Sequence, residues 1–115
     1  MNAPLSPIMR RERSPQVFLS QELNRRLEKL RPNHKFKKWI NDMADVLKEN
    51  KFAGELIKKD QTPKVYIEKF EVNNLYRYDH PEGYRSCYTI LNKCPHILDL
   101  MSHPEYEKVF GYGTT

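Results

Sequence analysis

The sequence has few of the features that mark membrane, secreted or phosphate-loop proteins. Its 115 residues contain no run near the ~20 consecutive apolar residues that a membrane span needs. Two cysteines are too few for a disulfide scaffold, and four scattered glycines form no phosphate-binding loop. The N-terminus has no apolar segment after its basic residues and does not resemble a secretory signal. These absences predict a cytoplasmic protein with reduced thiols and no membrane segment.

Charged and aromatic residues are what the chain has in their place. Charged residues make up 30% of the sequence and aromatic residues 11%, and 20 Lys and Arg against 15 Asp and Glu give a net charge of +5. The length fits one domain, and the basic excess suits an anionic partner. Prolines interrupt the basic N-terminus. We therefore predict a disordered basic arm over residues 1–14, followed by a single domain over 15–115.

Two amphipathic helices are expected in the N-terminal half. Leucines recur at helical spacing after Ser20, a suitable N-cap, and predict a helix over 20–31 that ends before Pro32. The strongest periodicity in the chain predicts a second helix over 33–49. Its apolar stripe consists of Phe36, Trp39, Ile40, Met43, Val46 and Leu47. A short helix and a strand are both open for 62–73.

The C-terminal half has the pattern of a β-sheet. Aromatic and β-branched runs at 75–80 and 84–91 flank a Pro-Glu-Gly turn and predict a hairpin, and 96–101 predicts a third strand. Strand alternation predicts one face with Tyr84, Ser86, Tyr88 and Ile90, and another with Arg85, Cys87 and Thr89. The expected fold class is α+β, with the two N-terminal helices packed on one face of a small antiparallel sheet of three or four strands.

The hairpin carries two arginines. With the turn centred on Pro81, Arg77 would lie directly across from Arg85, and facing like charges destabilise a pair of strands by up to ~1 kcal/mol. A shared anion between them would relieve the repulsion. The alternative is that both guanidinium groups point into water or pair with Glu82 or Asp79.

Metal chemistry is not expected. The side chains of the ligating types, Cys87, Cys94, His96 and His103, match no zinc spacing. We expect no metal and no cofactor, and Cys87 as a small residue of the sheet. Chemistry would then depend on bases, hydroxyls and cations, which are the groups that metal-independent ribonucleases use.

Residues 74–90, NLYRYDHPEGYRSCYTI, resemble the hairpin of the RelE/ParE toxin superfamily. The runs ILDLMSH at 97–103 and EKVF at 107–110 stand where that family has its last strand and tail. The resemblance covers roughly residues 16–112 and implies a RelE-like fold, with a short strand and two helices before the main strands.

The resemblance implies the toxin of a type II toxin–antitoxin pair, neutralised by an acidic, partly disordered antitoxin. RelE-type members cleave messenger RNA, typically on the ribosome, whereas ParE-type members act on DNA gyrase. We expect a metal-independent mRNA endoribonuclease that acts with the ribosome and leaves a 2′,3′-cyclic phosphate. The alternatives are a non-catalytic relative that binds a protein or nucleic acid, and a gyrase inhibitor.

The resemblance also implies site residues. Arg85 matches the arginine that contacts the scissile phosphate, and His103 falls near the family's basic residue on the last strand. Phe110 stands where the family usually has a tyrosine, so Tyr106 or Tyr112 would supply the catalytic hydroxyl. The residues expected to bind phosphate or RNA are Arg77, Lys58, Lys59 and Lys64.

Overall fold

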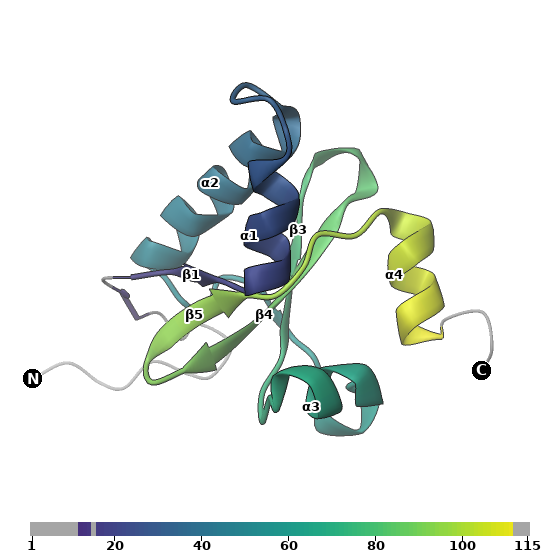
Figure 1. Ribbon diagram of the computed structural model, residues 1–115. Helices are drawn as coiled ribbons and strands as arrows, with labels where there is room; N and C mark the ends of the chain where they lie inside the picture. Colours follow the sequence, from purple (N-terminus) through teal and green to yellow (C-terminus); the bar gives the residue numbers. More distant parts are fainter. Residues whose placement is uncertain (1–11, 15, 112–115) are drawn as a thin grey trace, which may run out of the picture.

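The computed structural model describes residues 12–14 and 16–111 (Figure 1). The elements are β1 (Phe18–Leu19), α1 (Gln21–Glu28), α2 (Lys35–Glu49), β2 (Glu55–Leu56), η2 (Lys59–Gln61), α3 (Lys64–Phe70), β3 (Tyr76–Asp79), η3 (Pro81–Gly83), β4 (Arg85–Leu91), β5 (Cys94–Ile97) and α4 (His103–Phe110). The fold class is α+β, as the sequence predicts. No helix in the described part of the chain is long and apolar enough to cross a membrane.

The sheet has five strands in the order β1-β5-β4-β3-β2. Three neighbouring pairs are antiparallel, but β1 runs parallel to β5, with Phe18 opposite His96. The sheet is therefore mixed, and the prediction of an antiparallel sheet of three or four strands is wrong. The first strand, β1, is the short strand expected before the two helices, whereas β2 has only two residues and is too short for alternating hydrophobicity to reveal it.

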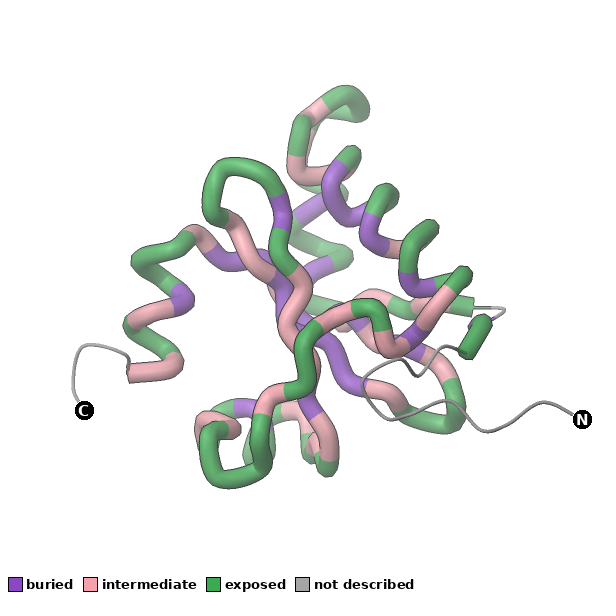
Figure 2. Tube along the Cα trace, turned by 180° about the vertical axis from the view of Figure 1, so that it is seen from behind, coloured by how far each residue is buried: buried purple, intermediate pink, exposed green. Residues whose placement is uncertain are grey.

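Helices lie on both faces of this sheet (Figures 1 and 2). On one face, α1 and α2 form a core with the sheet, and its buried residues are Leu23, Leu27, Ile40, Met43, Leu47, Tyr88, Ile97 and Leu100. On the other, α3 and α4 contribute to a second core of Tyr66, Leu75, Cys87, Leu98, Met101 and Tyr106. The prediction of helices on a single face holds for α1 and α2 alone.

The predicted N-terminal helices form with shifted ends. The Ser20 hydroxyl caps α1 by accepting a hydrogen bond from the Leu23 amide at 3.1 Å, but α1 ends at Glu28, three residues before the expected end. The cap of α2 is His34, whose Nδ1 accepts from the Phe36 amide at 3.0 Å. Imidazole therefore does here what a Ser or Asp side chain usually does at a helix start.

Trp39 confirms how α2 meets the sheet. Its side chain is buried, with 6% exposed, and its ring centroid lies 5.2 Å from that of Tyr84. Tyr84 belongs to the hairpin face that strand alternation predicts together with Ser86, Tyr88 and Ile90. In Figure 2 the buried residues follow the inner side of α2 and the central strands.

The segment between β2 and β3, residues 57–75, leaves the sheet at its edge and is called the excursion below. It leaves β2 through η2, forms α3 and returns at Leu75, whose carbonyl accepts a hydrogen bond from the Ile57 amide at 2.9 Å. The helical alternative for this segment is therefore the one observed. The helix ends at Phe70 because Glu71 adopts a left-handed conformation, with φ 54°.

Residues 102–111 form a capped helix, where a polar tail and the end of a strand were expected. The Ser102 hydroxyl accepts from the Glu105 amide at 3.4 Å, and the Glu105 carboxylate accepts from the Ser102 amide at 2.9 Å. Gly111 ends α4 with φ 71°. The placement of His103 on a last strand is wrong, because this capping box makes it the first residue of α4.

The hairpin register differs by two residues from the expected one. The loop Pro81–Gly83 is closed by a hydrogen bond from the His80 amide to the Tyr84 carbonyl at 2.8 Å. Asp79 therefore lies opposite Arg85, and Arg77 lies opposite Cys87. Side chains alternate with a period of two, so both arginines still share the predicted face.

The end of the predicted N-terminal arm contacts the domain. The Glu12 carbonyl accepts from the Lys51 amide, and the Ser14 amide donates to the Lys48 carbonyl, both at 2.8 Å. The Glu12 carboxylate also lies 2.6 Å from the buried Lys51 ammonium. Residues 1–11 of the arm lie outside the described part of the chain.

Candidate functional site

Three elements bring two arginines and a tyrosine together on the α3/α4 side of the sheet. Arg77 comes from β3, Arg85 from β4 and Tyr106 from α4. The guanidinium carbons lie 5.8 Å and 4.7 Å from the centroid of the Tyr106 ring. The register makes the arginines diagonal neighbours, and the face of the ring attracts both cations. Two positive charges are thus held at one place on the sheet.

Two carboxylates partly neutralise this pair of cations. Asp79 Oδ1 lies 3.1 Å from Arg77 Nε and 3.7 Å from Arg85 Nε, and Glu55 Oε2 lies 2.6 Å from Arg77 Nη2. Each arginine side chain is 21% exposed. Of the two possibilities that the sequence left open, the structure therefore shows the pairing with Asp79, whereas Glu82 pairs with Lys35.

Arg77 keeps its charge despite partial burial. Burial by itself lowers the pKa of Arg77, but a side-chain hydrogen bond with Tyr106 and the nearby charges of Asp79 and Glu55 outweigh it and raise that pKa above its ordinary value. The guanidinium is therefore cationic at any physiological pH, and it is paired with the Glu55 and Asp79 carboxylates.

A cavity of about 480 Å³ opens beside Arg77, between β2, the segment around η2 and α4. Its apolar walls are Leu56, Ile57, Pro63, Tyr106, Val109 and Phe110. The Phe110 ring stacks on that of Tyr106, with centroids 4.2 Å apart and planes at 17°. The cavity joins a cationic end to an apolar wall.

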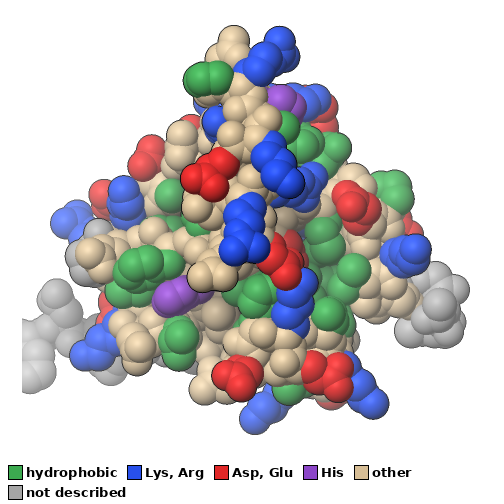
Figure 3. All heavy atoms as spheres, viewed as in Figure 1, with side chains coloured by type: hydrophobic (Ala, Val, Ile, Leu, Met, Phe, Trp, Pro, Cys, Tyr) green, Lys and Arg blue, Asp and Glu red, His purple; other side chains and the backbone are tan. Residues whose placement is uncertain are grey.

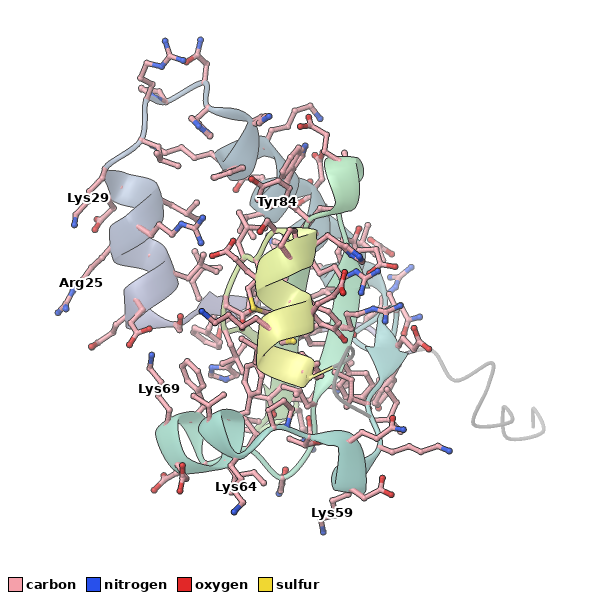
Figure 4. All side chains as sticks on the ribbon, turned by 90° about the vertical axis from the view of Figure 1, so that its right-hand side faces the viewer. Arg25, Lys29, Lys59, Lys64, Lys69 and Tyr84 are labelled. Atoms are coloured by element: carbon pink, nitrogen blue, oxygen red, sulfur yellow. The ribbon has the colours of Figure 1, made fainter. Side chains whose placement is uncertain are left out.

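The three predicted lysines divide between two places. Lys64, the first residue of α3, lines the cavity beside Arg77, whereas Lys58 and Lys59 line a separate hollow of about 370 Å³. In Figure 4 Lys59 and Lys64 lie on the segment below α4 and point away from it. Lys59 and Lys64 therefore offer positive charge at the periphery of the site.

The predicted acid–base residues are arranged unequally. His103 begins α4 beside the hairpin loop: its Cβ would lie 3.6 Å from a Cβ added at Gly83. Its Nε2 contacts the Glu107 carboxylate, and its side chain is half-exposed. Tyr106 is fully buried against the arginines. Tyr112 lies outside the described residues.

Sequence reasoning missed a column of basic side chains over α1. Figure 3 shows Lys and Arg side chains following one another down the middle of the face that carries α1. Figure 4 shows Arg25 and Lys29 projecting from that helix. Lys69 of α3 continues toward α1, with its ammonium 2.7 Å from Glu22 Oε2. The spacing of Arg25 and Lys29, four residues apart, was the available signal.

A buried carboxylate beneath α3 was also missed. Asp99 Oδ2 accepts a hydrogen bond from the Tyr66 hydroxyl at 2.6 Å, and Oδ1 accepts from the Cys87 amide at 2.8 Å. Burial raises the pKa of Asp99 to about 6, against the opposing effect of these two hydrogen bonds. The carboxylate attaches α3 to β4, so its role is structural.

His80 occupies a comparable position on the α1/α2 side. Its Nε2 lies 2.8 Å from Ser86 Oγ, and its ring stacks on Trp39 with centroids 6.1 Å apart. Burial lowers the pKa of His80 to about 4, although the charge of Asp79 acts in the opposite direction. The imidazole is therefore neutral at pH 7 and fixes the base of the hairpin.

Residues 12–14 and 16–111 contain no group of three or more His, Cys, Asp or Glu side chains placed to hold a metal. Burial raises the pKa of the Cys87 thiol well above its ordinary value, so this thiol is not an activated nucleophile. No family model, curated protein or solved structure matches the chain. The RelE/ParE resemblance stays a hypothesis based on the residues quoted for it.

Proposed function

We propose that this protein is the toxin of a type II toxin–antitoxin pair of the RelE type, an mRNA endoribonuclease that works with the ribosome in the cytoplasm. The observation that carries the proposal is the convergence of Arg77 and Arg85 on Tyr106, beside a cavity at the sheet surface. Paired guanidinium groups bind phosphate oxygens in fixed geometry, which a phosphodiester substrate requires.

In this proposal the chain's own side chains perform a metal-independent cleavage. The ribose 2′-oxygen attacks the phosphorus, the bond to the 5′-oxygen breaks, and a 2′,3′-cyclic phosphate remains. Arg85 and Arg77 stabilise the charge that develops on the phosphate, and the half-exposed His103 takes the proton of the 2′-hydroxyl and returns it to the leaving 5′-oxygen. Tyr106 acts as a positioning residue, because its buried ring lies against both guanidinium groups.

The proposed partner is an acidic, partly disordered antitoxin. A net charge of +5 and the basic column over α1 favour association with an acidic chain, and such a chain would fold on binding. Carboxylates of such an antitoxin would contact the site arginines as Glu55 and Asp79 do within this chain, where each lies against an arginine of the site.

One observation favours a second candidate, a relative that binds RNA or protein without cleaving it. Tyr106 has no exposed surface, and Arg77 is held by Glu55 and Asp79 at 2.6 Å and 3.1 Å. A catalytic site of this arrangement has to exchange those carboxylates for a phosphate, whereas a binding surface needs no such exchange.

Arg85→Ala separates the two candidates. We expect induction of the wild-type protein to arrest growth with cleavage of translated messages, and Arg85→Ala to lose ~10²–10³ in cleavage rate, by comparison with loss of one stabiliser of developing charge. Arg85→Lys should recover activity only in part, because it loses the bidentate geometry. The matched control is Arg31→Ala, an exposed arginine between α1 and α2, which should stay fully active.

Other results of the Arg85→Ala experiment would support one of the alternative functions. Unchanged arrest by a folded Arg85→Ala protein removes the ribonuclease proposal, and loss of gyrase activity in those cells would identify the ParE-type alternative. A wild-type protein that binds RNA, cleaves none and arrests nothing supports the non-catalytic relative.

A further inference from the structure

The cavity beside Arg77 has walls that phosphate binding does not explain. Six of its lining residues are apolar, and two of its polar lining residues, Glu55 and Asp60, carry negative charge. Lys64 and Arg77 line the same cavity and balance these two carboxylates, so the lining has no excess of positive charge, and its apolar walls suit a part of a nucleic acid other than phosphate. Its neighbour Arg77 fixes where the phosphate would lie.

We propose that this cavity binds one RNA base that carries an exocyclic amino group, next to the phosphate held by Arg77 and Arg85. The inference rests on the proposed function and adds to it a base preference. Adenine, cytosine and guanine have the amino group, and uracil does not. The protein should therefore discriminate against uracil at this position.

Size and wall chemistry support a base as the ligand. The volume of about 480 Å³ lies within the roughly 300–1,000 Å³ of small-ligand sites. The partly exposed Phe110 ring, which stacks on the buried Tyr106, forms an aromatic wall on α4, with Val109 beside it. Bases stack on aromatic side chains whatever their identity, so this wall supplies affinity rather than selectivity.

Selectivity would come from the opposite wall, which η2 and the start of α3 form. Asp60 and Gln61 line the cavity there, and a carboxylate accepts hydrogen bonds from an amino group but gives none to a carbonyl. Thr62 contributes shape, because its hydroxyl already donates to the Lys58 carbonyl at 3.1 Å. Base choice is thus assigned to the excursion between β2 and β3.

The test measures binding of short fluorescent oligoribonucleotides of A, C or U by anisotropy at one fixed ionic strength. Wild-type protein should bind the A and C oligomers more tightly than the U oligomer. Asp60→Asn should reduce that difference while leaving binding of the U oligomer unchanged. Asp45→Asn, a matched change on the exposed side of α2, should preserve the wild-type pattern.

A second variant fills the cavity. Val109→Trp, at a partly exposed position of α4, should weaken binding of the A oligomer about tenfold, the effect expected when one stacked base is lost. Leu91→Trp, at an exposed apolar position at the end of β4, is the control and should have no effect. Thermal melting of each variant shows whether it is folded, and Asp60→Asn still decides the question if Val109→Trp does not fold.

The results separate this inference from the proposed function. Equal binding of all three oligomers, insensitive to Asp60→Asn and Val109→Trp, overturns the base site even when Arg85→Ala abolishes cleavage. A wild-type protein that neither binds RNA nor arrests growth overturns the proposed function and the base site with it.

Discussion

The two faces of the sheet use the same strands for different purposes. Along β4, Ser86 and Tyr88 point into the α1/α2 face and are fully buried, whereas Arg85 on the other face is partly exposed beside α4. Both faces enclose a core, and the α3/α4 face carries in addition a charged site next to a cavity. The comparison shows that a single alternating strand fixes the core and the candidate site in one register.

The largest expected effect on stability concerns the α1/α2 face of the sheet. Trp39→Ala should lower the free energy of unfolding by roughly 3–5 kcal/mol, because it empties a buried contact with Tyr84 and His80. Urea denaturation measures the loss. Leu91→Ala, at an exposed position, should cost no more than about 0.5 kcal/mol. A loss under about 1 kcal/mol for Trp39→Ala would mean that α2 does not pack on the sheet as described.

The two faces should respond to pH in opposite directions. The folded-state pKa of His80, about 4, is below its ordinary 6.5, so His80 stabilises the fold above pH 6.5 and this contribution is lost as pH falls toward 4. The folded-state pKa of Asp99, about 6, is above its ordinary 3.8, so its contribution is complete below pH 3.8 and is lost as pH rises toward 6.

Two substitutions separate these contributions. His80→Gln should remove the loss of stability on acidification, on the order of 1–2 kcal/mol between pH 6.5 and 4 after solvent screening of the charge. Asp99→Asn should remove the loss on the alkaline side, on the order of 2–3 kcal/mol between pH 4 and 6. Denaturant midpoints across that range measure both. If the denaturant midpoints of the wild type and both variants changed with pH in the same way, the two faces would not respond to pH in opposite directions.

A smaller effect tests whether the site contributes to stability. Arg85→Ala should cost about 0.5–1 kcal/mol, because its guanidinium lies over the Tyr106 ring and near Asp79. The exposed Arg31→Ala should change stability by less than about 0.5 kcal/mol. Chemical denaturation compares the two variants. Equal values would mean that the contact of Arg85 with Tyr106 adds nothing to the fold.

We expect removal of metal ions to have no effect on stability. Exhaustive chelation should leave the melting temperature unchanged, because the described residues contain no cluster of metal-ligating side chains. Cys87, buried in the sheet, and Cys94, at the start of β5, should both titrate as free thiols in denaturant. A clear drop in melting temperature on chelation would point to a metal bound by the protein.

The sequence predicted the features that depend on periodicity. The stripe with Trp39 and the alternation around Tyr88 follow directly from residue spacing, and both hold in the structure except at Val46, which is 40% exposed at the edge of the stripe. The hairpin register does not follow from spacing, because it depends on how the Pro81–Gly83 loop closes. A two-residue difference kept Arg85 on its face but gave it Asp79 as its cross-strand partner.

Other features were missed either because a local signal was overlooked or because they depend on tertiary contacts. The sequence Ser102-His103-Pro104-Glu105 carries a complete capping signal, which could have predicted α4 and with it the position of Tyr106. The cavity could not have been predicted, since it depends on where α4 and η2 meet. The burial of Asp99 likewise depends on the docking of Tyr66 from α3, which no local pattern encodes.

The excursion between β2 and β3 leaves and re-enters the sheet at one point, where the Ile57 amide bonds to the Leu75 carbonyl. Tyr66 of α3 holds the rest of the segment to the second core through its hydrogen bond to Asp99. Residues 58–61 are exposed and lie outside that core, so we expect changes of sequence or length there to alter the cavity wall while Arg77 and Arg85 stay fixed on the inner strands. The same four residues are a suitable place for grafting recognition loops in protein design.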